Sequence, residues 1–214
     1  SPSTADTFTL LHPHAKTALY WKDACISYAV FCLKKKTIAR RFSLAAGARA
    51  VIFAENRPEW LATLHAIWRR QAVVVPVDAM AQADELAYIV GQTEPVIVFC
   101  SEKTRPVVDL ALANLSGLRP QVIVFDAEDF PAIPANAQTH TGLESGPLDS
   151  LAAILFTSGT TGAPKGVMLT FGNLLTNLQL VCERVPIYQA SGRVFALLPA
   201  HHIAARVRAL PPVR

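Results

Sequence analysis

The chain has 214 residues and a formal net charge of +4, from 20 Lys and Arg against 16 Asp and Glu. Because 51% of the residues are hydrophobic and 17% are charged, the chain can bury a sizeable core, which excludes a generally disordered protein. The mild positive charge is well short of the dense cationic face of a dedicated nucleic-acid binder, so no nucleic-acid partner is expected. A phosphate-rich small ligand or an anionic membrane surface would suit this charge.

Cysteine usage and the N-terminal residues predict a cytoplasmic protein. None of the four cysteines lies at C-x-x-C spacing, so we expect reduced thiols, with no disulfide framework and no zinc site. Residues 1–10 lack the basic and apolar segments of a secretory signal. No stretch reaches the roughly 20 apolar residues that span a bilayer. Any membrane contact is therefore expected to be peripheral.

Apolar runs and helical periodicities alternate from about residue 50. Residues 50–54 form a short apolar run that predicts a buried strand. Pro58 and Glu59 suit the first turn of a helix, in which apolar residues including Trp60 and Trp68 recur at helical spacing. We expect both tryptophans to be core anchors.

The same alternation continues along the chain. Further strands are predicted at residues 72–76, 96–100 and 121–125, and helices at residues 84–90, closed by Gly91, and 104–115, closed by Gly117. Pro76 is expected to mark the end of its strand. Apolar strands separated by single helices imply parallel pairing, because each crossover helix covers one face of the sheet. The sequence therefore predicts a doubly wound α/β fold of mostly parallel sheets with flanking helices.

A change of composition suggests where this unit ends. Residues 131–150 contain three prolines, two glycines and several small polar residues, which is typical of a linker or a long surface loop. We therefore predict a first α/β subdomain at residues 1–130. The start of a second subdomain is predicted at residues 151–214, opening with a strand at residues 151–156.

Directly after that predicted strand comes the segment Thr157-Ser-Gly-Thr-Thr-Gly-Ala-Pro-Lys-Gly166, followed by a helix predicted at residues 172–184. Glycines let the backbone approach a ligand closely and turn its N–H groups toward one point. The hydroxyl groups add short donors, and Lys165 adds a mobile positive charge. Together these groups suit the β- and γ-phosphates of a nucleotide.

The segment is not the P-loop of NTPases, G-x-x-x-x-G-K-[ST]. Pro164 stands where that motif has glycine before the lysine, and Gly166 stands where it has Ser or Thr. The segment therefore departs from the P-loop pattern at two of its defining positions.

The loop closely resembles the phosphate-binding signature of the adenylate-forming ligases, which include acyl-CoA synthetases, luciferases and the adenylation domains of peptide synthetases. The similarity extends from Asp149 to Thr170. Other stretches look like further landmarks of this family in the same order: Ser27-Tyr28, Glu55-Asn-Arg-Pro-Glu-Trp60, Val73-Val-Val-Pro76, Glu85-Leu-Ala-Tyr-Ile89 and Arg193-Val-Phe-Ala-Leu-Leu-Pro-Ala-His-His-Ile203. The resemblance implies part of the large N-terminal domain of an acyl-CoA synthetase-like fold.

The resemblance also implies a reaction and a set of ligands. In this family a carboxylate attacks the α-phosphorus of ATP to give an acyl-adenylate and pyrophosphate, and a thiol, often that of coenzyme A, then displaces AMP. By carry-over the residues that hold the β- and γ-phosphates, with Mg²⁺ nearby, are Thr157, Ser158, Gly159, Thr160, Thr161, Gly162 and Lys165. His202 would line the acyl-substrate side. The Leu-Pro-x-His-His pattern is most similar to fatty-acid–CoA ligases, so a fatty acid is the expected acid.

The family pattern is incomplete in this sequence. The chain ends at Arg214 and lacks the family's Tyr-Gly-x-Thr-Glu and Thr-Gly-Asp segments, its basic hinge and the small domain with the catalytic lysine. We therefore expect no catalytic residue within these 214 residues, and a chain that does not form acyl-adenylate by itself. A partial domain also exposes sheet edges and apolar faces, which predicts a homodimer.

Three alternatives stay open at this point. The chain could belong to an aromatic-acid ligase or a peptide-synthetase adenylation domain of the same superfamily. It could also be a non-catalytic interaction domain that retains the fold, or part of an unrelated NTPase or kinase.

Overall fold

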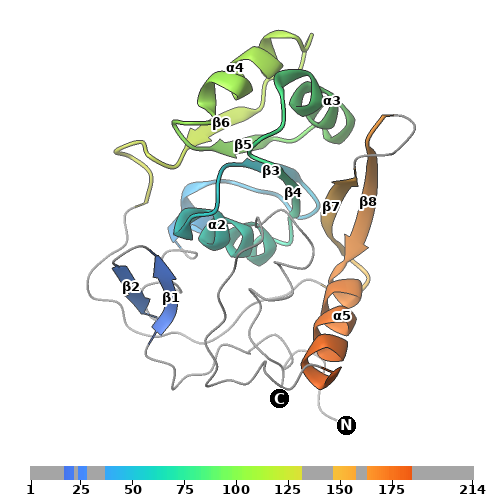
Figure 1. Cartoon of the computed structure of the whole chain (residues 1–214). Coiled ribbons are helices and arrows are strands. Elements are labelled where there is room, and N and C mark those ends of the chain that lie inside the picture. Colours follow the sequence, from blue (N-terminus) through green and yellow to red (C-terminus); the bar gives the residue numbers. More distant parts are fainter. Residues whose placement is uncertain (1–16, 22–23, 28–36, 132–146, 158–162, 185–214) are drawn as a thin grey trace.

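The computed structural model of the chain describes residues 17–21, 24–27, 37–131, 147–157 and 163–184. β1 (Thr17–Trp21) and β2 (Ala24–Ser27) form a small antiparallel sheet. The larger sheet has six strands in the order β6-β5-β3-β4-β7-β8 (Figure 1).

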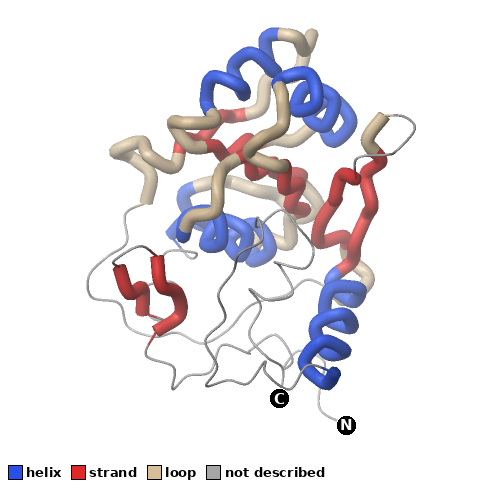
Figure 2. The backbone as a smooth tube through the Cα atoms, viewed as in Figure 1, coloured by secondary structure: helices blue, strands red, loops and turns tan. Residues whose placement is uncertain are grey.

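The larger sheet and its helices make up most of the described chain. Its strands are β3 (Arg49–Phe53), β4 (Val73–Val77), β5 (Ile97–Cys100), β6 (Gln121–Val124), β7 (Leu151–Thr157) and β8 (Lys165–Thr170). The helices are α2 (Pro58–Arg69), α3 (Ala83–Thr93), α4 (Arg105–Ala113) and α5 (Phe171–Arg184). β3 to β7 run parallel, and β8 is an antiparallel edge strand. This arrangement confirms the predicted α/β fold with a mostly parallel sheet (Figure 2).

The central strand β3 is buried on both faces. Its side chains alternate between two apolar clusters, because successive residues of a strand point to opposite faces. Ala50 and Ile52 pack with Trp60 and other residues of α2. Val51 and Phe53 pack with residues of α3 and α4. Figure 1 shows α2 on one side of the sheet and α3 with α4 on the other.

Helix α2 begins as the sequence predicts. Pro58 occupies the first turn, where its missing N–H is not needed, and Glu59 places a negative charge at the positive end of the helix dipole. Trp60 and Trp68 are 1% and 3% exposed, so both are core anchors as predicted. None of the helices in the described part of the chain is long and apolar enough to cross a membrane.

The predicted end of α3 at Gly91 is wrong. The helix continues to Thr93, and the left-handed residue that closes it is Glu94, with φ of 42°. The reason is a long-range cap: Arg49 of β3 donates a hydrogen bond from Nε to the carbonyl oxygen of Thr93. Arginine side chains that bond to the last carbonyls of a helix stabilise its C-terminal turn. The predicted closure of α4 by Gly117 is also wrong, because this helix ends at Ala113 with Asn114 as its cap, and Gly117, with φ of 83°, lies beyond the cap.

The strand β8 was not predicted, and β4 continues one residue past Pro76. A proline between two neighbouring strands leaves one ladder position without an N–H donor. In agreement, the β4–β7 ladder is confined to Val74 and Ala153.

The base of the β7–β8 hairpin is closed by backbone hydrogen bonds to the start of α5. Gly172 donates to the carbonyl of Leu148 at 2.7 Å, and Phe171 donates to the carbonyl of Ser150 at 3.0 Å. A Cβ on residue 172 would lie 2.9 Å from the Leu148 oxygen, which leaves room for glycine only. Thr170 and Asn173 form a reciprocal cap, in which each side-chain oxygen accepts the other's backbone N–H.

The strand after residues 131–150, β7, joins the same sheet as β3 to β6. The described part of residues 151–214 therefore extends the sheet of the first predicted subdomain. The division at residues 131–150 stays a prediction, because residues 132–146 and 185–214 lie outside the described residues.

Replacing Trp68 with Phe should destabilise the fold, because the Trp68 indole N–H donates to the buried Ala152 carbonyl at 2.9 Å and ties α2 to β7. An unsatisfied buried carbonyl costs about 1–3 kcal/mol. We expect a loss of that size in the free energy of unfolding measured with urea. Leu110→Ala, on an exposed position of α4, is the control and should change it by less than about 0.5 kcal/mol. Equal effects of the two substitutions would contradict this role of Trp68.

Candidate functional site

The two ends of the predicted phosphate loop face each other across the β7–β8 hairpin. Thr157 pairs with Lys165, and Phe156 pairs with Gly166, in an antiparallel register. The Thr157 hydroxyl lies 3.5 Å from the Lys165 carbonyl oxygen, to which it donates. Both Thr157 and Lys165 are exposed, and no carboxylate of the described residues pairs with Lys165. Within the described part of the chain its ammonium group is therefore open to an anion.

The other predicted site residues cannot be placed in the same way. Ser158, Gly159, Thr160, Thr161, Gly162 and His202 all lie outside the described residues. The structure thus brings together Thr157 and Lys165, and the roles of all these residues stay predictions.

Gly166 has a steric role at the base of the loop. A Cβ on this residue would lie 3.0 Å from Cγ2 of Ile154 and 3.2 Å from Cζ of Phe156. Both distances are shorter than ordinary van der Waals contact, so any side chain here would displace the two neighbours. Glycine lets β8 lie close against the Phe156 ring.

The loop follows the carboxyl end of β7, and the carboxyl ends of β3 to β7 share one edge of the sheet because these strands are parallel. Ligands of open α/β sheets bind at this edge, where neighbouring strands have connections that leave in opposite directions. The strand order places two such points in this sheet. One lies between β3 and β5, and the other between β4 and β7.

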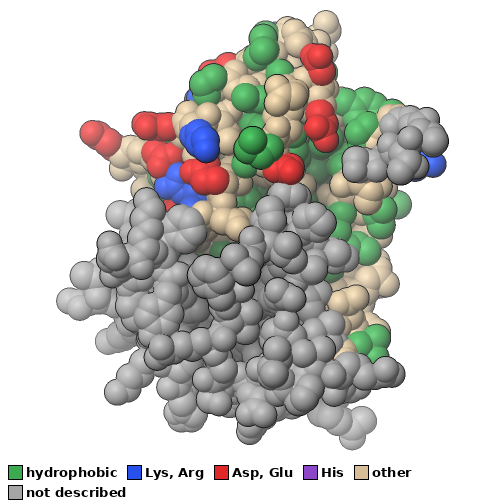
Figure 3. All heavy atoms as spheres, viewed as in Figure 1, with side chains coloured by type: hydrophobic (Ala, Val, Ile, Leu, Met, Phe, Trp, Pro, Cys, Tyr) green, Lys and Arg blue, Asp and Glu red, His purple; other side chains and the backbone are tan. Residues whose placement is uncertain are grey.

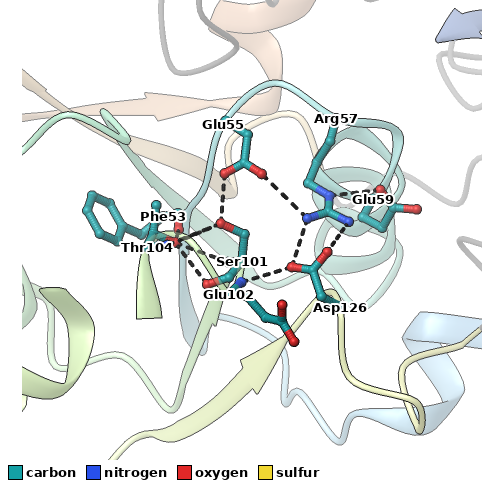
Figure 4. Close-up of polar contacts among 8 residues, drawn as sticks. All are labelled: Phe53, Glu55, Arg57, Glu59, Ser101, Glu102, Thr104 and Asp126. Carbon is teal, nitrogen blue, oxygen red and sulfur yellow. Dashed lines mark hydrogen bonds and ion pairs between the residues drawn. The ribbon is translucent and has the colours of Figure 1, made fainter. Parts of the chain in front are cut away.

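At the ends of β3 and β5, polar side chains of the protein bond to one another (Figure 4). The Ser101 hydroxyl donates to Glu55 at 2.7 Å, and the Thr104 hydroxyl donates to the Phe53 carbonyl at 2.7 Å. The Ser101 and Thr104 hydroxyl oxygens lie 3.2 Å apart. This chain of hydrogen bonds joins the ends of the two strands to the start of α4.

Arg57 is the centre of the adjoining ion-pair cluster. Its guanidinium lies 2.8 Å from Asp126, 3.0 Å from Glu59 and 3.5 Å from Glu55, and 5.6 Å from the centre of the Phe125 ring. Burial alone would lower the pKa of Arg57, but its bonds to Asp126 and Glu59 outweigh burial and raise that pKa. Hydrogen bonding from Arg57 lowers the pKa of Asp126, against a smaller opposing effect of burial.

The cluster links three strand ends, because Asp126 also accepts the Glu102 backbone N–H at 2.8 Å. Its carboxylates are used in hydrogen bonds and ion pairs, which is a structural role. The sequence signal was the Glu55-Asn-Arg-Pro-Glu59 stretch, but nothing in it identified Asp126 as a partner 69 residues away. Among the described residues no group of three or more His, Cys, Asp or Glu side chains could hold a metal ion.

Cys100, at the end of β5, is free and buried. Burial raises the pKa of its thiol to about 12, so the nucleophilic thiolate does not form near neutral pH. Cys100 is therefore not suited to act as a nucleophile.

A model of the AMP-binding enzyme family matches residues 9–214, nearly the whole chain. The chain therefore belongs to the AMP-binding enzyme family, as the loop and its flanking stretches predict. This excludes the alternative of an unrelated NTPase or kinase.

Curated relatives of the chain act on different acids. It is 30% identical over 217 residues to the sulfoacetate–CoA ligase of Cupriavidus necator, covering 94% of this chain and 42% of that ligase. It is also 30% identical to the L-proline–[L-prolyl-carrier protein] ligase of Pseudomonas fluorescens, covering 87% and 38%. The peroxisomal long chain acyl-CoA synthetase 7 of Arabidopsis thaliana is again 30% identical, over 71% and 24%. The chain thus spans less than half the length of each relative.

The fold also matches solved structures of this kind. The ATP-bound crystal structure of MatB from Rhodopseudomonas palustris superposes with a TM-score of 0.71 and 26% identity, covering 87% of this chain and 39% of that chain. The sheet described above is therefore the fold of an adenylate-forming enzyme.

Replacing Asp126 with Asn should change how stability depends on pH. The folded pKa of Asp126 lies below the unfolded value of about 3.9, so its ionised form stabilises the fold above that value. This contribution is lost as the pH falls through the folded pKa. We expect Asp126→Asn to be less stable than wild type near pH 7, with the difference shrinking below about pH 4, in urea unfolding across pH 2–7. Asp129→Asn, which removes an exposed partner of Arg41, is the control and should leave the curve nearly unchanged.

Proposed function

We propose that this chain is part of an ATP-dependent ligase that joins a carboxylic acid to a thiol, and that its β7–β8 loop binds the phosphates of MgATP. The observation that supports this most directly is the pairing of Thr157 with Lys165. It holds an exposed hydroxyl and an exposed ammonium group at the two ends of one glycine-rich loop, at the ligand-binding edge of the sheet. Membership in the AMP-binding enzyme family agrees with this site.

The proposed reaction has two steps. A carboxylate oxygen attacks the α-phosphorus of ATP, the bond from that phosphorus to the bridging oxygen breaks, and pyrophosphate leaves. The thiol of coenzyme A, or of a carrier protein, then attacks the acyl carbonyl, and AMP leaves with the electron pair. Negative charge grows on the departing pyrophosphate in the first step. Positive charge and hydrogen-bond donors fixed near that group lower the barrier.

Lys165 and Thr157 would act on the pyrophosphate portion. The ammonium group of Lys165 offsets the growing charge, and the Thr157 hydroxyl donates to a phosphate oxygen. Mg²⁺ enters with the nucleotide as MgATP, because Mg²⁺ in such sites is held largely by phosphates and water. These roles concern binding and charge stabilisation, and we assign no general base or nucleophile to the described residues.

We propose that the acid is a fatty acid. The sequence pattern that ends in His201-His202 and the long chain acyl-CoA synthetase relative support this choice. The sulfoacetate and proline ligases show that similar chains act on small polar acids. The proline ligase also favours a second candidate function, transfer of the acyl group to a carrier protein.

Titration of the purified chain with MgATP and with magnesium pyrophosphate tests the loop directly. With phosphate contacts alone we expect a dissociation constant near or above about 1 mM by calorimetry. Lys165→Ala should weaken the binding of MgATP and of magnesium pyrophosphate to the same extent. Lys103→Ala is a matched control, because Lys103 is an exposed lysine that follows β5, which β3 and β4 separate from β7. Absence of binding by the wild-type chain would favour the alternative of a non-catalytic interaction domain.

Substrate exchange tests the acid. In a protein that contains this chain at the full length of its relatives, ATP–pyrophosphate exchange should be stimulated by long-chain fatty acids more than by sulfoacetate, benzoate or proline. Each acid must first form its acyl-adenylate for exchange to occur, so the assay reads acid choice independently of the thiol acceptor. Stimulation by proline alone would replace the fatty-acid proposal with an adenylation domain, and stimulation by benzoate alone with an aromatic-acid ligase.

A further inference from the structure

The end of β7 that leads into the loop is not held by the neighbouring strand. The ladder between β4 and β7 is confined to Val74 and Ala153, whereas β7 continues to Thr157. Pro76 has no N–H to offer β7 beyond that point. β8 pairs with residues up to Thr157, but β8 is itself the edge strand. The position of this end relative to the rest of the sheet therefore depends on side-chain contacts.

Phe156 makes such a contact with α3. Its ring lies 6.5 Å from the ring of Tyr88, measured between centroids, at an interplanar angle of 84°. This edge-to-face geometry is favourable for two aromatic rings. Phe156 also packs against the apolar cluster on the α3 and α4 side of the sheet. Tyr88 is 36% exposed, so one part of it packs while the rest faces outward.

On its other side, Phe156 meets the bare backbone of β8. Gly166 pairs directly with Phe156, and a Cβ on Gly166 would lie 3.2 Å from Cζ of the ring. The ring therefore spans from α3 to β8. Phe156 and Gly166 form one cross-strand pair of the hairpin, and the next pair, Thr157 and Lys165, lies at the two ends of the loop. A shift of the ring would therefore move both ends of the loop.

We propose that Tyr88 is a positioning residue for the phosphate loop: through Phe156 and the bare backbone of Gly166 it fixes both loop ends relative to α3. This inference rests on the proposed function, since it assumes that the loop binds phosphates. When several hydrogen-bond donors converge on one ligand, a displacement of the donors by about 0.5–1 Å weakens binding of that ligand. Tyr88 touches no phosphate in this proposal, and its ring acts only through Phe156.

The test compares substitutions that keep or remove the ring. Tyr88→Phe retains it and should bind magnesium pyrophosphate as the wild type does. Tyr88→Ala should bind it about twofold to tenfold more weakly, if the energy of one edge-to-face contact is used to hold the loop. Amide NMR titration is suitable because it reads dissociation constants above about 1 mM. In the free protein, Tyr88→Ala should also shift the amide signals of Thr157 and Gly166.

Controls separate positioning from stability. All titrations are made at a temperature at which circular dichroism shows each variant to be folded. Leu110→Ala removes an exposed apolar side chain from α4 and should change neither the affinity nor the Thr157 and Gly166 signals. If Tyr88→Ala does not fold, Gly166→Ala disturbs the same ring from the other side, and it should weaken pyrophosphate binding while Tyr88→Phe does not.

The outcomes are distinct. If the wild type binds pyrophosphate and Tyr88→Ala, or Gly166→Ala in its place, binds equally well, the positioning role is overturned and the proposed function stands. If Tyr88→Phe loses as much affinity as Tyr88→Ala, the contact is not what positions the loop, and the inference is again overturned. If the wild type does not bind pyrophosphate, the proposed function fails first and the inference falls with it.

Discussion

Burial of the central strands on both faces is the constraint on which the rest of this structure depends. β3 and β4 lie inside a parallel sheet, so every crossover must return over one face and cover it with a helix. The alternation of Ala50 and Ile52 with Val51 and Phe53 assigns α2 to one face and α3 with α4 to the other. With the helices placed in this way, the carboxyl ends of five strands lie at one edge of the sheet. At two places on that edge, between β3 and β5 and between β4 and β7, the connections of neighbouring strands leave in opposite directions.

The protein uses these two points differently. Between β3 and β5, Arg57 and its carboxylate partners join the strand ends, so the Arg57 guanidinium is not free to bind an anionic ligand (Figure 4). Beside β4 and β7, the hairpin presents Thr157 and Lys165, and both are exposed. Figure 3 shows hydrophobic side chains along this hairpin. In β8, Val167 and Met168 are 44% and 68% exposed. One point therefore stabilises the sheet, and the other is available for a ligand.

How much the sequence predicts depends on the range of the interactions involved. Local signals, such as apolar runs and Pro58 at a helix start, predict the parallel strands and α2 well. The end of α3 was mispredicted because its cap comes from Arg49, far away in the chain, and not from a local glycine. β8 was missed because Lys165–Thr170 is a strand through its pairing with β7, not through its own composition. Likewise, the loop motif identifies Thr157 and Lys165 as candidate phosphate-binding residues, but only the pairing of β7 with β8 shows that they lie opposite each other.

The hydrogen bonds at the base of the hairpin limit how its length can change. Gly172 and Phe171 bond to the carbonyls of Leu148 and Ser150, so neither end of the hairpin can give up or take in a residue without breaking them. A deletion within β8 must then be absorbed by a slip of its register, and a slip of one residue turns each side chain to the opposite face. Lys165 would point away from the face that it now shares with Thr157. Insertions and deletions are therefore tolerated best at the tip of the hairpin, and the number of residues between Lys165 and the hydrogen bonds at the base of the hairpin is fixed.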